Sequence, residues 1–385
     1  MRKILIILGL FVLVLSSCRK DEKPLPSDNT EVTDGTDGDI KGFFLLNEGN
    51  MGSNKASLDY FDYQTGIYSR NIFAERNPSV ARELGDVGND MQIYGGKLYA
   101  VINRSNLIEV MELATAKHVA TISIPNSRYI TFNKGYAYVS SYAGAIENDP
   151  TKRRGYVAKI DTLTMSVVAE CEVGYQPEEM VVAGNKLYVA NSGGYTAPDF
   201  DNRVSVIELT GFSLLKHLEV AINLHRMELD SDGKIWVSSR GDHDRNGSDI
   251  FIIDPVTDQI SGLELPLPCS NMVACGDSLY VYSNSFNTST GKNTVSYALV
   301  NTKTKAVVSR NFIKDGTESS IGIPYGLAVN PESREIIVTD AKDYLTPGTV
   351  YCFSKAGHLK WSALTGDIPA HIVFTDRKLQ PIADE

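Results

Sequence analysis

Residues 180–191 read Met-Val-Val-Ala-Gly-Asn-Lys-Leu-Tyr-Val-Ala-Asn. Gly184 and Asn185 form a dipeptide typical of tight turns, because both residue types tolerate a left-handed backbone. The apolar, β-branched and aromatic residues on either side favour strands. The segment therefore predicts two short antiparallel strands joined by a two-residue turn.

The same pattern recurs along the chain. Each copy has a short apolar run, a turn rich in Gly, Asn or Asp, and an apolar or aromatic strand, and a second pair of strands follows it. The first residues of successive copies are 39 to 55 residues apart, in and just above the range of four-stranded propeller blades. The six copies are 91–101, 130–139, 180–189, 227–237, 272–281 and 327–338.

A seventh unit is divided between the two ends of the chain. Residues 42–47 look like a second strand without a first, and 371–374 look like a first strand without a second. Joined, they complete a blade and remove an open sheet edge. The sequence thus predicts an all-β chain: a seven-bladed β-propeller with four-stranded blades over 42–378, closed by pairing of the N- and C-terminal strands, with a tail at 379–385. Six or eight blades would need a missed or merged repeat.

Composition excludes several classes of protein. Hydrophobic residues make up 42% of the chain and charged residues 22%, which is typical of a globular protein. The net charge of -10, without a basic run, argues against nucleic-acid binding. Five cysteines without a CxxC pair exclude a zinc ribbon or a thioredoxin-type site. Cys171, Cys269, Cys275 and Cys352 are expected to be small buried apolar residues.

The N-terminus has the features of an export signal. A basic start, an apolar run and small residues predict a signal peptide over 1–17. Leu15-Ser16-Ser17-Cys18 resembles a bacterial lipobox, in which Cys18 would be lipidated; the alternative is a plain signal peptide with a chance cysteine. Residues 18–41 are expected to form a flexible tether. Within them, 19–22 resemble the signal that sends Bacteroidetes lipoproteins to the outer leaflet, so we expect a lipid-anchored protein at the surface of the outer membrane.

The hairpin at 184–191 resembles those of YncE-like seven-bladed propellers, and the resemblance covers about 42–378. With the lipobox and tether, the chain resembles surface lipoproteins of Bacteroidetes, including the cobalamin-binding (BtuG-type) proteins. That resemblance implies capture of cobalamin (vitamin B12) or a related corrinoid and delivery to a TonB-dependent outer-membrane transporter. It implies no catalytic residue, no required cofactor, a monomer, and contact with the membrane through lipid alone.

One face is predicted to carry the function. Loops between second and third strands are expected to be long at 47–57, 141–155, 191–203, 239–249, 283–293 and 340–349, and short at 103–106. Long connections usually carry function. Aromatic rings would contact the corrin ring, and amides and arginines would form hydrogen bonds with the amide groups at its edge. Some of the aromatic rings would serve only to pack the loops. The candidate ligand residues are Asn47, Glu48, Asn50, Arg104, Arg128, Tyr129, Tyr142, Tyr175, Gln176, Tyr195, Phe200, Arg226, Arg240, His243, Phe286, Asn287, Tyr325, Tyr344 and His371.

The loop at 242–249 resembles the first half of a calcium-binding loop. Asp242, Asp244, Asn246 and Asp249 would supply oxygen ligands. Position twelve is Ile253 rather than Glu, so a full EF-hand is excluded. The alternatives are a solvated polar loop, or a loop whose basic residues at 240, 243 and 245 meet the ligand.

Two other functions stay open. The first is partnership with a transporter for another nutrient, such as a siderophore or a glycan. The second is an enzyme: Glu48, Asn47 and Asp340 imitate the metal site of propeller lactonases, and His225 with His371 imitates propeller lyases. Neither set follows a recognisable pattern, and no GxSxG or phosphate-binding loop occurs. We therefore expect a binding protein and not an enzyme.

Overall fold

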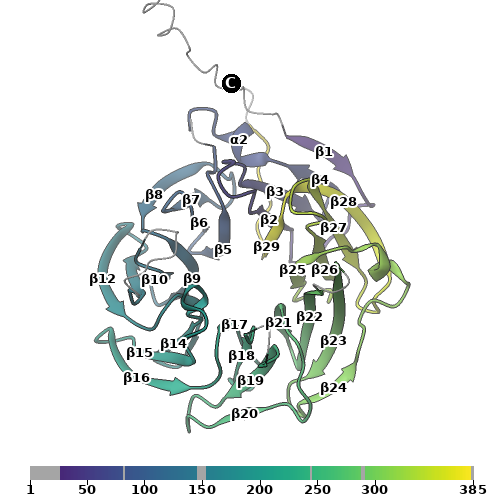
Figure 1. Cartoon of the computed structure of the whole chain (residues 1–385). Coiled ribbons are helices and arrows are strands. Elements are labelled where there is room, and N and C mark those ends of the chain that lie inside the picture. Colours follow the sequence, from purple (N-terminus) through teal and green to yellow (C-terminus); the bar gives the residue numbers. More distant parts are fainter. Residues whose placement is uncertain (1–26, 81–82, 145–152, 243–244, 288–290, 383–385) are drawn as a thin grey trace, which may run out of the picture.

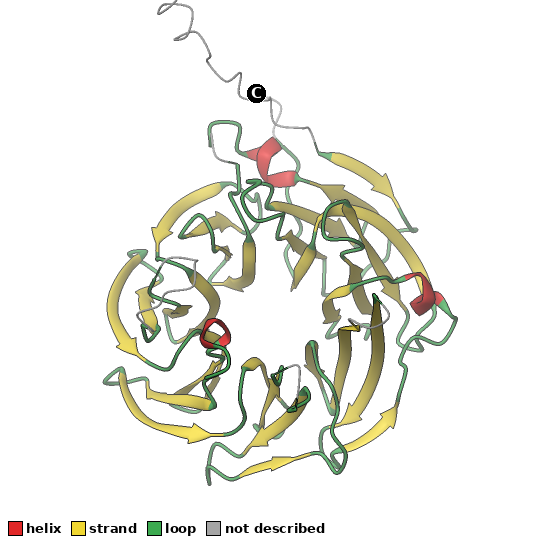
Figure 2. Ribbon diagram, in the orientation of Figure 1, coloured by secondary structure: helices red, strands yellow, loops and turns green. Residues whose placement is uncertain are grey.

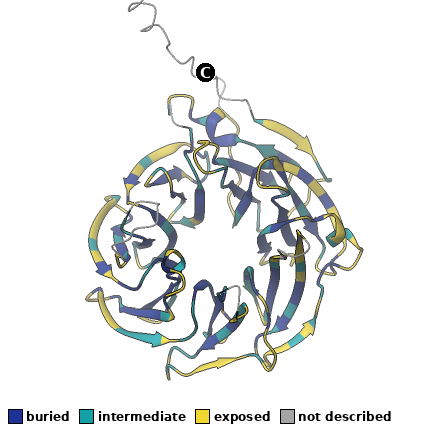
Figure 3. Cartoon of the chain, in the orientation of Figure 1, coloured by how far each residue is buried: buried dark blue, intermediate teal, exposed yellow. Residues whose placement is uncertain are grey.

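The computed structural model describes residues 27–80, 83–144, 153–242, 245–287 and 291–382. Seven antiparallel sheets are arranged in a ring (Figure 1), which confirms the predicted seven-bladed propeller. We call the region enclosed by the innermost strands the channel. In each four-stranded sheet the first strand is innermost and the fourth lies at the rim. The inner strands are mostly buried and the outer strands largely exposed (Figure 3). Among the described residues, no helix is long and apolar enough to cross a membrane.

Blades 2 to 4 follow the chain without interruption. Blade 2 contains β5 (Gly88–Tyr94), β6 (Lys97–Ile102), β7 (Leu107–Glu112) and β8 (His118–Ser123). Blade 3 contains β9 (Ser127–Asn133), β10 (Tyr136–Ser141), β11 (Tyr156–Asp161) and β12 (Ser166–Glu172). Blade 4 contains β13 (Pro177–Ala183), β14 (Lys186–Asn191), β15 (Arg203–Glu208) and β16 (Ser213–Glu219).

Blades 5 to 7 repeat the arrangement. Blade 5 contains β17 (Leu224–Leu229), β18 (Ile235–Ser239), β19 (Asp249–Ile253) and β20 (Ile260–Gly262). Blade 6 contains β21 (Asn271–Cys275), β22 (Ser278–Asn287), β23 (Lys292–Asn301) and β24 (Ala306–Ser309). Blade 7 contains β25 (Pro324–Val329), β26 (Ile336–Asp340), β27 (Pro347–Phe353) and β28 (Leu359–Asp367). The described helices are short: α2 (Ile72–Arg76), η1 (Gly194–Thr196) and η2 (Thr317–Ser320), of which η1 lies on the inner side of blade 4 (Figure 2).

Blade 1 joins the two ends of the chain. Its innermost strand is β29 (Pro369–Thr375), which pairs with β2 (Gly42–Asn47). Next come β3 (Ser57–Asp62) and β4 (Ile67–Arg70). Phe43 pairs with Phe374, and the Lys41 N–H donates to the Thr375 carbonyl at 2.8 Å. The split blade expected from the sequence is therefore present, and it leaves no open edge at the seam.

Part of the expected tether is ordered. β1 (Asp28–Glu31) pairs with β4 as a fifth strand of blade 1. Further on, the Ile40 N–H donates to a Glu332 carboxylate oxygen at 2.9 Å. The prediction of a flexible tether over 18–41 was therefore wrong for these residues. The physical reason is that the outer edge of β4 offers unpaired backbone groups to any extended segment, whatever its side chains.

Aromatic packing seals the seam between blades 1 and 7. The rings of Phe61 and Trp361 are 4.5 Å apart, and those of Phe43 and Phe61 are 5.3 Å apart. Trp361 comes from β28 and the two phenylalanines from blade 1. Such ring pairs contribute about 1 kcal/mol each beyond their buried area.

In each blade the loop between the second and third strands lies on the same face of the ring as the beginning of the innermost strand. We call this face the loop face. The predicted connections are present in blades 1, 3, 4, 5 and 7, and 103–106 in blade 2 is short. Blade 6 differs, because β22 and β23 stay paired from Ser278–Asn301 out to Asn287–Lys292. The predicted loop 283–293 is therefore mainly a projecting hairpin.

Among the described cysteines none forms a disulfide. Cys171, Cys269 and Cys352 are buried, as expected, whereas Cys275 is partly exposed at the end of β21. Cys18 lies outside the described residues, so its lipidation stays a prediction.

Candidate functional site

The side chains at the centre of the loop face come from one repeated position. In each blade a pair of residues stands directly before the long apolar residue (Met, Ile or Leu) that begins the repeat in the innermost strand. In every blade except blade 6, strand pairing shifts register at or beside this pair. Such bulges re-aim side chains. The pairs are Asn89-Asp90, Arg128-Tyr129, Glu178-Glu179, His225-Arg226, Ser270-Asn271, Tyr325-Gly326 and Ala370-His371.

A left-handed residue precedes this position in five blades. The residues are Val87, Asn126, Gln176, Asn223 and Ile368, with φ between 43° and 62°. A side chain in this region costs roughly 1–2 kcal/mol, and β-branched residues rarely adopt it. The surrounding packing therefore holds the backbone in a strained bend just before the site, a feature that concentrates at functional sites.

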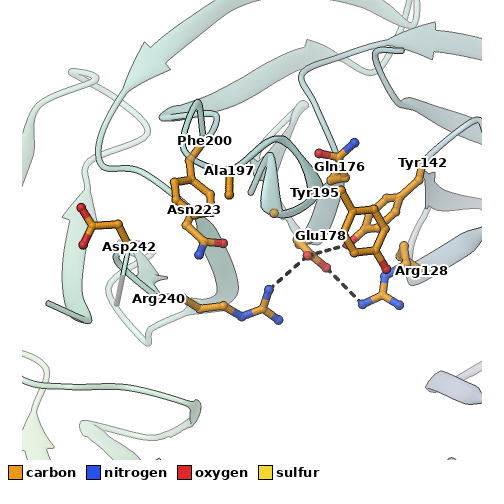
Figure 4. A pocket seen from close by; sticks show the side chains of 11 residues that line it. Arg128, Tyr142, Gln176, Glu178, Tyr195, Ala197, Phe200, Asn223, Arg240 and Asp242 are labelled. Carbon is orange, nitrogen blue, oxygen red and sulfur yellow. Dashed lines mark hydrogen bonds and ion pairs between the residues drawn. The ribbon is translucent and has the colours of Figure 1, made fainter. Parts of the chain in front are cut away.

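Glu178 is the hub of a polar cluster on the loop face. Its carboxylate accepts hydrogen bonds from the hydroxyls of Tyr142 at 2.6 Å and Ser192 at 3.1 Å. It also lies 3.5 Å from Arg128 Nη2 and 3.4 Å from Arg240 Nη1 (Figure 4). Burial alone would raise the pKa of Glu178, but the two arginines and the hydrogen bonds hold it below its usual value. The carboxylate is thus an anion shared by two cations.

A cavity of about 430 Å³ opens beside this hub, between blades 3, 4 and 5. We call it the hub cavity. Figure 4 shows an open space with Asn223 and Arg240 on one side and Tyr195, Tyr142 and Arg128 on the other. The lining residues are Arg128, Tyr142, Gln176, Glu178, Gly194, Tyr195, Ala197, Phe200, Asn223, Arg240 and Asp242.

Three polar atoms of the hub cavity have no hydrogen-bond partner among the described residues. They are Gln176 Oε1, Asn223 Oδ1 and Arg128 Nε. The Asn223 Nδ2 group donates to the Gly241 carbonyl at 2.9 Å, which leaves its oxygen as the unpaired acceptor. An unpaired buried polar group costs about 1–3 kcal/mol. Because the three atoms are themselves buried, a ligand in the cavity does not reach them in this arrangement.

Aromatic rings form the remaining wall. Tyr195 lies edge-on to Tyr142, with ring centroids 5.7 Å apart. Tyr142 is buried, and Arg128 lies 5.0 Å from the centre of its ring. Tyr195 is 47% exposed. Tyr142 therefore supports the cluster, whereas Tyr195 offers a free ring to a ligand.

A second cluster lies at the mouth of the channel. His371 Nε2 is 3.9 Å from Glu48 and His371 Nδ1 is 3.6 Å from Asp90. The Tyr325 hydroxyl donates to Glu48 at 2.9 Å. Burial raises the pKa of Glu48 and of Asp90 to about 7. Burial and nearby Arg226 lower the pKa of His371 well below its usual value, so the ring is neutral at pH 7.

The channel below contains a cavity of about 250 Å³ lined by innermost strands, which we call the channel cavity. Arg226 and Glu179 form an ion pair across it at 2.5 Å. The Glu179 carboxylate also accepts from the Met227 N–H at 2.8 Å. Since β13 and β17 belong to neighbouring blades, these bonds tie blades 4 and 5 together at the axis.

Glu228 makes the stability of the fold depend on pH. Burial, and next the charge of Glu179, raise the pKa of Glu228 from 4.5 to about 8. Its favourable contribution to folding is therefore complete below pH 4.5 and is lost as the pH rises through 8. We expect the free energy of unfolding to fall by up to about 1.4 kcal/mol from pH 7 to pH 8 on this account. Urea unfolding at both pH values measures the slope, and Glu228→Gln should flatten it; an unchanged slope in the variant contradicts the assignment.

The structure brings together eleven of the candidate ligand residues. Arg128, Tyr142, Gln176, Tyr195, Phe200 and Arg240 line the hub cavity. At the mouth of the channel lie Glu48, Tyr129, Arg226, Tyr325 and His371. The two groups meet where Arg128 and Arg226 flank the Tyr129 ring, at 5.8 and 5.5 Å.

Of the other described candidate residues, Tyr344 borders the mouth of the channel, and the rest lie apart from these groups. Asn47 is buried, and its amide donates to the Ser57 hydroxyl at 3.1 Å. Tyr344 packs edge-on to Tyr325 at 5.9 Å. The remaining described candidates lie on separate parts of the loop face: Asn50, Arg104, Tyr175 and Phe286. Asn287 is the last residue of β22. His243 lies outside the described residues.

The proposed calcium ligands are engaged within the protein. Asp242 Oδ1 accepts from the Arg245 and Asn246 N–H groups, both at 2.9 Å, and Oδ2 accepts from Asn246 Nδ2 at 2.6 Å. Asp249 Oδ1 accepts from the Leu267 N–H at 2.9 Å. Asp244 lies outside the described residues, among which no group of three metal-ligating side chains converges. These contacts match the polar-loop alternative.

The lactonase-like set does not converge. Asp340 accepts from the Gly322 and Ile323 N–H groups at 3.1 and 2.8 Å, and its carboxylate supports a connection in blade 7. Asn47 is committed to Ser57, as described above. Glu48 alone of the three reaches the mouth of the channel.

Sequence reasoning missed Glu178, Glu179, Asp90 and Asn223. It favoured aromatic rings, amides and arginines, and it left out carboxylates that pair with those arginines. A signal was available, because the aligned repeats place these acids one or two residues before the first residue of a copy, Met91 or Met180. Asn223 occupies the position of Gln176 in the next blade.

Comparison with solved structures agrees with the fold. A quinonprotein alcohol dehydrogenase-like protein from Bacteroides thetaiotaomicron is 16% identical, with TM-score 0.60 over 88% of this chain and 79% of that one. Apo AztD from Citrobacter koseri is 11% identical, with TM-score 0.53 over 87% and 98%. Kuenenia stuttgartiensis hydrazine synthase is 13% identical, with TM-score 0.54 over 70% and 76%. At these identities the likeness concerns the fold alone.

Sequence comparison identifies the family. Among curated proteins, none matches this chain. Residues 41–367 match the family described as domain of unknown function (DUF5074). This stretch includes most of the chain, and the protein therefore belongs to that family.

Proposed function

We propose that this protein captures cobalamin or a related corrinoid on its loop face and delivers it to a TonB-dependent outer-membrane transporter. The observation that carries the proposal is the lining of the hub cavity. The amides of Gln176 and Asn223 and the guanidinium group of Arg240 lie beside the half-exposed ring of Tyr195. Amide and guanidinium groups supply hydrogen-bond donors and acceptors. A primary amide supplies both partners at once, and corrinoids carry a fringe of such amides.

The shape of the loop face supports a ligand larger than the hub cavity. At about 430 Å³ the cavity is too small for a whole corrinoid, so the bulk of the ligand would rest across the adjoining loops. The exposed rings of Tyr195 and Phe286 offer apolar contact there, and they lose little conformational entropy on binding because each has few rotatable bonds. The projecting hairpin of blade 6 would provide a wall on the far side of the channel.

Binding alone accounts for the site without a catalytic step or a required cofactor. Tight binding needs a large contact area, preformed loops and matched hydrogen bonds. Glu178 and its partners are already fixed by mutual contacts, which supports a preformed site. We propose a monomer held at the cell surface by lipid on Cys18. The position of β1 at the rim of blade 1 supports this arrangement, because it leaves the loop face uncovered.

The direct test is co-elution with cyanocobalamin. After mixing at micromolar concentration and desalting, the protein fraction should be pink. Tyr195→Ala should raise the dissociation rate about tenfold, because the contact of this exposed ring with the ligand contributes roughly 1.4 kcal/mol to the binding free energy. Leu163→Ala is the matched control, since Leu163 is 88% exposed in a turn on the opposite face. A colourless protein fraction contradicts the corrinoid proposal, and an unchanged dissociation rate for Tyr195→Ala places the ligand elsewhere.

A further inference from the structure

Asp201 lies where three segments around the hub cavity meet, although it is not one of the residues that line the cavity. It is 4% exposed and lies between η1 and β15. Its Oδ2 atom accepts from the Tyr175 N–H at 2.9 Å, and its carbonyl oxygen accepts from the Asn223 N–H at 2.9 Å. Tyr175 belongs to the connection from blade 3 to blade 4, and Asn223 to the connection from blade 4 to blade 5. One residue of blade 4 therefore holds both connections.

Arg203 fixes the orientation of the Asp201 carboxylate. Its Nε atom donates to Oδ1 and its Nη2 atom to Oδ2, both at 2.8 Å, and its backbone N–H donates to Oδ1 at 3.1 Å. Two-point pairing of this kind sets the angle as well as the distance. With the Tyr175 N–H, the carboxylate is therefore surrounded by four donors, and an ionised carboxylate is a group that only accepts.

The same contacts hold together the two ends of the loop 193–200, which supplies Tyr195 and Phe200 to the cavity lining. The Gly193 N–H donates to the Tyr175 carbonyl at 2.9 Å. Gly193 has φ 57°, and a Cβ there would lie 2.2 Å from the Asp201 nitrogen, so only glycine permits this approach. A loop whose ends lie this close is compact and presents its side chains from a fixed base.

Two further walls of the hub cavity depend on Asp201. Gln176 directly follows Tyr175, and Asn223 is itself bonded to Asp201. Both have left-handed backbones, with φ 43° and 55°. Such a backbone persists only where surrounding contacts hold it. The hydrogen bonds to Asp201 are among the contacts that hold these two residues beside the cavity.

We propose that Asp201 is the positioning residue of the hub cavity. Through the Tyr175 and Asn223 N–H groups and the closed ends of the loop 193–200, it holds the cavity in its binding arrangement without touching the ligand. Affinity then depends on a side chain buried behind the cavity wall, because a preformed site loses less conformational entropy on binding. This inference rests on the proposed function in one respect, since it takes the hub cavity as the ligand site.

The test compares Asp201→Asn with the wild-type protein by amide hydrogen exchange and by titration with cyanocobalamin. Asparagine has the same shape, but its amide would turn an N–H group toward one of the four donors. Exchange in peptides covering 172–178, 190–203 and 220–225 should accelerate about tenfold, while the innermost strands of blades 1, 2 and 7 keep their rates. Gly193→Ala forces the same loop ends apart and should show the same pattern.

The titration distinguishes positioning from general support of the fold. Asp201→Asn should weaken cyanocobalamin binding about tenfold at a temperature where circular dichroism shows the variant to be folded. In that background Tyr195→Ala should cost clearly less affinity than it costs the wild-type protein, because the ring is no longer held toward the ligand. Loss of stability alone would leave the effect of Tyr195→Ala unchanged.

Asp340→Asn is the matched control. The Asp340 carboxylate is also buried, at the second-to-third connection of blade 7, and accepts from the N–H groups of Gly322, Ile323 and Lys342 at 3.1, 2.8 and 2.8 Å. This variant should accelerate exchange around its own connection and leave the affinity for cyanocobalamin unchanged.

The outcomes separate this inference from the proposed function. If Asp201→Asn and Asp340→Asn weaken cyanocobalamin alike, or if Asp201→Asn accelerates exchange in every blade or in none, the positioning role is overturned while corrinoid capture stands. If the wild-type protein does not bind cyanocobalamin, corrinoid capture fails. Exchange confined to the three peptides would then still support the positioning role, and its absence would overturn that role too.

Discussion

Replacing Glu178 by alanine is expected to lower the free energy of unfolding by about 3 kcal/mol, because it leaves two arginines largely buried without their counter-ion. The Tyr142 and Ser192 hydroxyls also lose their acceptor. Ligand binding at the hub cavity should disappear in the same variant, since the arginine side chains lose the group that positions them. Urea unfolding and cyanocobalamin titration measure the two effects.

Two variants make this result specific. Glu178→Gln keeps an acceptor for the hydroxyls but removes the charge, so it should recover part of the stability. Glu172→Ala removes a carboxylate from an exposed pair, 3.3 Å from Arg154, and should cost less than about 1 kcal/mol. A loss for Glu178→Ala as small as that for Glu172→Ala would show that the hub does not support the fold.

Ending the chain before Pro369 is expected to abolish cooperative folding. The truncation removes β29, the innermost strand of blade 1, and leaves β2 with an unpaired edge facing the channel. It also uncovers the fully buried Phe43 and Phe44. Burying a phenylalanine side chain contributes about 2–3 kcal/mol, and a ring that cannot close loses contacts on both sides of the gap. Circular dichroism during heating should show no sharp transition.

The matched deletion removes a strand from the other side of the same blade. Without residues 27–31, blade 1 loses β1, whose side chains are exposed along its whole length. This variant should retain a cooperative transition with a melting temperature lowered by only a few degrees. Equal loss of folding in both variants would mean that the strand at the rim, and not the closure of the ring, holds the structure together.

The fold was predictable because its signals are local. Dipeptides such as Gly184-Asn185 fix hairpin turns, and their spacing fixes the number of blades. Even the split blade was visible, since 42–47 has the pattern of a strand without a neighbour. By contrast, residues 28–31 read Asp-Asn-Thr-Glu and carry no apolar signal. β1 exists because β4 offers it an edge, which is a property of the assembled sheet.

The loop face was predictable from loop lengths, but the contacts at its centre were only partly so. Tyr195, Phe200 and Arg240 could be chosen by residue type and loop position. The repeat marks the position of Glu178, but its role could not be predicted, because it depends on two arginines from other blades that reach it only after the ring closes. The bulges and left-handed residues that direct these side chains inward depend likewise on packing between neighbouring blades.

The seam inside blade 1 has a consequence for the order of the chain. β1 and the segment around Leu379, whose N–H donates to the Tyr60 hydroxyl at 3.3 Å, both lie against this one sheet. Because the first and last strands of the chain meet within one sheet, the ring does not require the chain to begin at any particular blade. Linking the two ends and cutting the exposed turn at 303–305 would give a circularly permuted protein in which the seam moves to blade 6 while every strand keeps its neighbours.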